Sequence, residues 1–85
     1  MEMNEQLVRA LIDVCVFLEY SSDEVIDPAA ALKAFEDLSA TLQSAEPSAQ
    51  KMLRTEMTRQ AASYGPDRSS FVEQLADNIG LCEGE

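Results

Sequence analysis

The sequence contains no histidine and no tryptophan, and it has only three glycines, three prolines and two cysteines among its 85 residues. Histidine is the commonest general acid–base residue and the commonest zinc ligand, so its absence removes the simplest catalytic and metal sites. The three glycines are not clustered, which argues against a glycine-rich phosphate loop. No serine or cysteine has a base at the spacing of a known nucleophile motif. We therefore expect no enzyme, no catalytic residues, no bound metal and no cofactor.

Basic residues are also scarce, because 6 Lys and Arg oppose 16 Asp and Glu, giving a net charge of −10. The acidic residues concentrate in residues 1–30 and 65–85, whereas residues 31–64 carry four acidic and four basic residues. Such a surface repels nucleic-acid phosphates and anionic lipids. We therefore expect neither direct nucleic-acid binding nor membrane binding, and a partner protein with a basic surface fits best. The alternative is that the acidity only keeps the protein soluble.

Long apolar runs are missing, since the longest, Val14 to Leu18, has five residues and is far too short for a membrane span. The N-terminus lacks the basic start and apolar core of a secretory signal, so a cytoplasmic location is expected. Cys15 and Cys82 should then be reduced thiols. Cys15 lies in an apolar run and is predicted to be a core residue, and Cys82 lies beside acids that make it a poor nucleophile.

Glycine and proline divide the rest of the chain into segments with helical apolar spacing. The sequence predicts one all-α domain over residues 1–85, a compact bundle of four helices at about 4–20, 28–44, 47–64 and 69–80, with a short helical turn near 22–26. Asp27 and Pro28 should open the second helix, and Gly65 should close the third. Ser70 with Glu73 has the spacing of a capping box for the fourth helix, which Gly80 should end.

The first helix has an unusually wide apolar face, which covers roughly 220° at 100° per residue. A helix on the outside of a bundle needs an apolar stripe of roughly 100° or somewhat more. Two interpretations follow: this helix is central in the bundle, or part of its face meets a second chain. Candidate residues for a homodimer face are Val8, Ile12, Val16 and Tyr20.

A small acidic chain without catalytic groups is typical of protein-binding modules, such as inhibitors, immunity proteins and antitoxins, that neutralise or regulate a basic partner. The candidate partner-binding residues are the acidic turn and the outer face of the last helix, that is Asp23, Glu24, Asp27, Glu73 and Asp77. The alternatives are a homodimerising structural or scaffold bundle, and a nucleic-acid mimic whose carboxylates imitate phosphates.

Overall fold

The computed structural model describes residues 4–83. Their secondary structure consists of four α-helices and one short 3₁₀-helix, with no strand. The elements are α1 (Glu5–Tyr20), α2 (Pro28–Gln43), α3 (Pro47–Gln60), η1 (Ala61–Ser63) and α4 (Pro66–Ile79). The predicted all-α bundle of four helices is confirmed. None of the helices in the described part is both long enough and apolar enough to cross a membrane.

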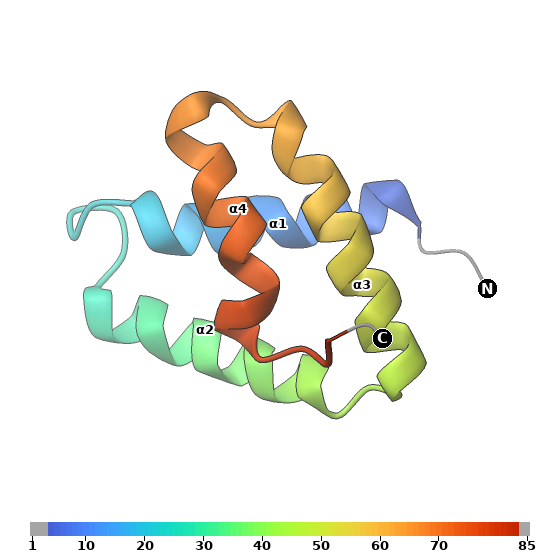
Figure 1. Cartoon of the computed structure of the whole chain (residues 1–85). Helices are drawn as coiled ribbons and strands as arrows, with labels where there is room; N and C mark the ends of the chain where they lie inside the picture. Colours follow the sequence, from blue (N-terminus) through green and yellow to red (C-terminus); the bar gives the residue numbers. More distant parts are fainter. Residues whose placement is uncertain (1–3, 84–85) are drawn as a thin grey trace.

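The helices form two antiparallel pairs that lie across one another (Figure 1). α1 and α2 run side by side in opposite directions, joined by residues 21–27, and α3 and α4 form the second pair in front of α1. α1 contacts each of the other three helices, as expected of a central helix, but α4 does so as well. The centre of the bundle is therefore shared between α1 and α4.

The starts of α1 and α2 follow from side-chain caps. The Asn4 side chain accepts a hydrogen bond from the Leu7 amide at 3.0 Å, and the Asp27 carboxylate accepts one from the Ala30 amide at 3.1 Å. Each bond satisfies a backbone donor that has no partner within the first helical turn. In the predicted turn near 22–26, the Ser22 carbonyl accepts hydrogen bonds from the amides of Val25 and Ile26, without a full helix.

The predicted boundary between the third and fourth helices is wrong. α3 ends at Gln60 and continues as η1, and Gly65 is the N-cap of α4 rather than the end of α3. Pro66 is the first residue of α4, a position where proline loses no helical hydrogen bond and where its fixed φ is already suitable. The predicted capping box of Ser70 and Glu73 therefore lies inside the helix.

Gly80 ends α4 as predicted, and the chain after it folds back onto the bundle. Gly80 adopts the left-handed conformation with φ of 91°, and the Leu81 amide donates to the Ala76 carbonyl at 3.0 Å, which is the Schellman arrangement. Leu81 is buried. The Arg54 guanidinium donates to the carbonyls of Leu81 and Cys82, so the chain is fixed up to Cys82.

The core is built mainly from α1, α3 and α4. Its fully buried side chains are those of Val8, Ile12, Cys15, Leu53, Met57, Ala61, Val72, Leu75, Ala76, Ile79 and Leu81. α2 supplies none of them, because its apolar residues Phe35, Leu38 and Leu42 are only partly buried against this cluster. α3 and α4 thus each bury one face in the core, whereas α2 covers the core from one side only.

Candidate protein-interaction site

An open apolar pocket of about 430 Å³ lies where α1 ends and α2 begins. Its apolar walls come from three helices and the connecting segment, chiefly through Leu18, Ile26, Leu32, Phe35 and Phe71. Leu32 is 59% exposed although it lines this pocket. The polar side chains of Glu19 and Asn78 also belong to the lining. A pocket of this size and chemistry is suited to an apolar group carried by another molecule.

Acidic residues outnumber basic ones at the same end of the molecule. Residues 10–32 contain five acidic residues and no Lys or Arg. The predicted partner-binding residues Asp23, Glu24 and Asp27 are exposed in and next to the connecting segment. Among the described residues, neither these three nor Glu19 form an ion pair, although Asp27 also caps α2. We call Glu19, residues 21–27 and the pocket the acidic end.

The other two predicted partner-binding residues, Glu73 and Asp77, are exposed on α4. Asp77 is already paired, because the Arg54 guanidinium lies 2.7 Å from its carboxylate. Its charge is therefore largely compensated within the chain. The two predicted groups lie on different elements, and of these two groups it is the acidic end that combines unpaired carboxylates with an apolar pocket.

The predicted homodimer face must be corrected at two of its four residues. Val8 and Ile12 are 2% and 0% exposed, so they belong to the core and are not available to a second chain. Val16 is partly buried against the core. The Tyr20 ring packs edge-on against Phe71 at a centroid distance of 5.6 Å. Val8 and Ile12 are therefore excluded as contact residues, whereas Tyr20 is 41% exposed and stays a candidate.

The free apolar surface of α1 lies on different residues. Leu7 is 71% exposed, and Val14 and Phe17 are each 48% exposed. With the exposed Ala10 they follow the spacing i, i+3, i+7 and i+10, which places them on one face of the helix. We call these four residues the α1 ridge. The wide apolar arc of the sequence therefore serves the core on one side and this ridge on another.

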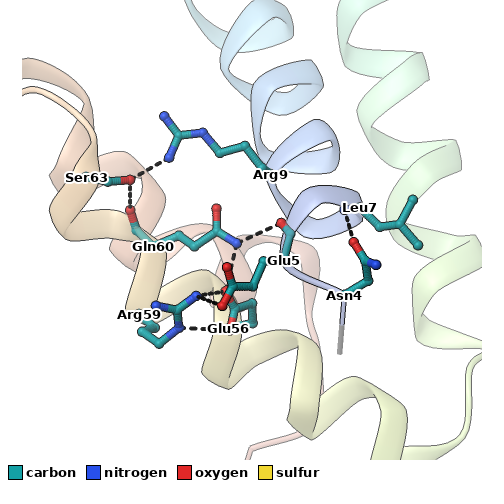
Figure 2. A network of polar contacts seen from close by, with 8 residues as sticks. All are labelled: Asn4, Glu5, Leu7, Arg9, Glu56, Arg59, Gln60 and Ser63. Carbon is teal, nitrogen blue, oxygen red and sulfur yellow. Dashed lines mark hydrogen bonds and ion pairs between the residues drawn. The ribbon is translucent and has the colours of Figure 1, made fainter. Parts of the chain in front are cut away.

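A polar cluster that the sequence did not predict joins the start of α1 to α3 and η1 (Figure 2). The buried Gln60 amide donates to the Glu5 carbonyl at 3.0 Å and to the Glu56 carboxylate at 2.8 Å. Arg59 pairs with both Glu56 and Glu5, and its hydrogen bond lowers the pKa of Glu56. The charges of this cluster are thus used to hold helices together.

The two cysteines occupy different environments. Cys15 is buried, and this burial raises the pKa of its thiol to about 11, which makes it a poor nucleophile at neutral pH. Cys82 is partly exposed, and both cysteines are free thiols. Within residues 4–83, His, Cys, Asp and Glu side chains do not gather in groups of three or more that could hold a metal ion.

The described surface thus combines an apolar pocket, unpaired carboxylates and an apolar ridge. No protein-family model matches the chain, and neither does any curated protein sequence or solved structure.

Proposed function

We propose that this protein is a binding module for another protein with a basic surface, which it engages through the acidic end. The observation that carries the proposal is the position of unpaired carboxylates beside an open apolar pocket. Elsewhere in the described chain, many acidic residues are paired with basic ones, as Asp77 is with Arg54 and Asp37 with Lys33. The carboxylates of the acidic end are free to attract a partner.

Unpaired surface carboxylates contribute mainly through the rate and selectivity of association. Their field reaches about 8–10 Å at physiological ionic strength, so it acts on a basic surface before contact is made. The overall charge of −10 adds to this attraction and repels acidic proteins and nucleic acids. An inhibitor or immunity-type role, in which the module occupies a basic active surface, is the form of binding that this charge favours.

The proposal is tested by capture of the partner from cells that express the protein. A variant carrying Asp23→Asn and Glu24→Gln removes two charges from the acidic end. A control carrying Glu36→Gln and Glu46→Gln removes two exposed charges from α2 and from the residue before α3. The native protein and the control should retain a basic protein in equimolar amount, which high salt releases, while the first variant should lose most of it.

Two results would count against this function. The first is the absence of any equimolar partner, or the capture of an acidic one. The second is that both variants retain the partner equally, because the charges of the acidic end would then contribute nothing to binding. Loss from the control alone would move the interface to α2 or to the start of α3.

A second candidate function, a homodimerising or scaffold protein, is favoured by the α1 ridge. Leu7, Val14 and Phe17 expose apolar surface along most of one helix, and exposed apolar patches commonly mark interfaces. The net charge of −10 opposes self-association. Light scattering at rising concentration separates the two functions: a dimer that Phe17→Lys abolishes and Val25→Lys leaves intact would establish this candidate.

A further inference from the structure

We infer that the pocket of the acidic end receives one large apolar side chain of the partner, projecting from a segment that also carries Lys or Arg. This inference rests on the proposed function and adds the chemistry of the segment that is recognised. The pocket, with about 430 Å³, is nearly twice the size of the apolar pocket of about 230 Å³ at the other end of the α1–α2 pair. It also lies within the range of volumes that hold ligands, about 300–1,000 Å³.

The walls of the pocket are suited to an aromatic or long aliphatic group. Phe35 and Phe71 provide aromatic surface from α2 and α4, and Leu18 and Leu32 provide aliphatic surface from α1 and α2. Water against these apolar walls has few polar partners, so an apolar group that displaces it there gains free energy. Protein interfaces commonly concentrate their binding energy in one anchor of this kind.

The charge around the pocket selects the residues next to the anchor. Glu19 lines the pocket, and Asp23 and Glu24 are exposed in the segment that contributes Ile26 to its wall. Lys33, next to Leu32 in the sequence, is engaged by Asp37, and Arg68, whose guanidinium lies over the Tyr20 ring, is paired with Asp67. A segment with Lys or Arg beside its anchor is therefore attracted, and a segment with Asp or Glu there is repelled.

The first experiment is the display of random 16-residue peptides against the intact protein. The selected peptides should share one Trp, Phe, Leu or Met within a helical turn of at least two Lys or Arg. Because the chain contains no tryptophan, the indole of a selected peptide with a single Trp can be excited selectively and its fluorescence emission recorded. Its maximum should shift to shorter wavelength when the indole enters the pocket.

The matched variants are Leu32→Gln and Leu7→Gln, two exposed leucines at opposite ends of the α1–α2 pair. Both side chains are mostly exposed, so both variants should keep the helical circular dichroism of the native protein. Leu32→Gln should weaken peptide binding about tenfold, which corresponds to the loss of one well-buried aliphatic contact. Leu7→Gln should leave the affinity within about twofold of the native value.

The outcomes separate this inference from the function on which it rests. Peptides that bind Leu32→Gln as well as they bind the native protein, or selected peptides without a basic residue beside an apolar one, overturn the pocket inference. So does the recovery of no peptide. If the captured basic partner is meanwhile lost from the variant with Asp23→Asn and Glu24→Gln, the proposed function stands and only the anchor is wrong.

Discussion

α2 and α4 are helices of similar length that pack very differently. α4, with 14 residues, buries Val72, Leu75, Ala76 and Ile79, whereas α2, with 16 residues, buries only the polar Ser39. α4 is thus held by the hydrophobic core, and α2 rests against its edge. The comparison indicates that α1, α3 and α4 supply the stability of the fold, while α2 and the segment before it provide an apolar surface that is left partly open.

The largest expected difference between the two helices comes from leucine truncation. Leu75 is 0% exposed and Leu32 is 59% exposed. Leu75→Ala should lower the free energy of unfolding by about 2–5 kcal/mol, because it removes buried methyl groups and leaves a cavity. Leu32→Ala should change it by less than about 1 kcal/mol, since most of the side chain is already in water. Urea denaturation measures both, and similar losses in the two variants would contradict the comparison.

The next largest change in stability is expected at Arg54, which fixes the chain after α4. Its guanidinium donates to the carbonyls of Leu81 and Cys82 at 2.8 and 3.0 Å and pairs with Asp77. Arg54→Met should cost about 1.5–3 kcal/mol, because partly buried carbonyls lose a charged donor. Lys33→Met removes an ion pair whose two side chains are 77% and 67% exposed, and it should cost about 0–0.5 kcal/mol. Equal costs by urea denaturation would show that the Arg54 bonds add nothing to fixing the chain end.

A loss of stability linked to the Cys15 thiol is expected in alkaline solution but not near neutral pH. Burial raises the pKa of Cys15 from 9.0 to about 11, so the thiol ionises in the unfolded chain at a lower pH than in the folded one. Stability from this group is therefore complete below pH 9 and is lost as the pH rises from about 9 to about 11. The pKa of Tyr64 is also raised, by burial and by its hydrogen bond to Asp13, and acts in the same direction.

The contribution of Cys15 is isolated by comparing how steeply the free energy of unfolding falls with pH in two proteins. Urea denaturation of the native protein and of Cys15→Ala should be followed across this alkaline range, because the variant keeps the contribution of Tyr64. The stability of the variant should fall less steeply with pH than that of the native protein. If the two slopes are equal, the Cys15 thiol titrates alike in the folded and unfolded chains, and its burial has no electrostatic consequence.

The parts of the fold that the sequence predicts are those determined by neighbouring residues. The starts of α1 and α2 were predictable because Asn4 and Asp27 bind amides three residues away. The start of α4 was not, because two local signals compete there. Pro66 allows a helix to begin at once, whereas Ser70 and Glu73 only have the spacing of a cap. The amides of Arg68 and Ser69 bond to the Gly65 carbonyl, so the earlier signal wins.

The candidate site was predictable in its charge but not in its shape. The exposed carboxylates Asp23 and Glu24 follow from their place in a polar turn. The choice between Ile12 and Val14 as the free side of α1 does not, because a wide apolar arc gives no direction toward the bundle. Likewise, the contact of Arg59 with Glu5 joins residues far apart in the sequence, and the pocket needs Phe71 from the last helix. These features depend on how the helix pairs cross.

The smallest predicted effect tests why α2 packs so weakly. Ser39 is its one buried residue, and its hydroxyl oxygen has no hydrogen-bond partner in the described chain. Ser39→Ala should raise the free energy of unfolding by about 0.5–1 kcal/mol, because it removes an unsatisfied buried hydroxyl and improves helix propensity.

Thr41→Ala on the same helix is the control, since Thr41 is exposed and its hydroxyl donates to the Asp37 carbonyl. If Ser39→Ala stabilises the fold more than Thr41→Ala does, the buried polar side chain of Ser39 weakens the packing of α2 against the core. If it destabilises the fold, the Ser39 hydroxyl must have a favourable contact, and the weakness of α2 then comes from its partly buried apolar residues alone.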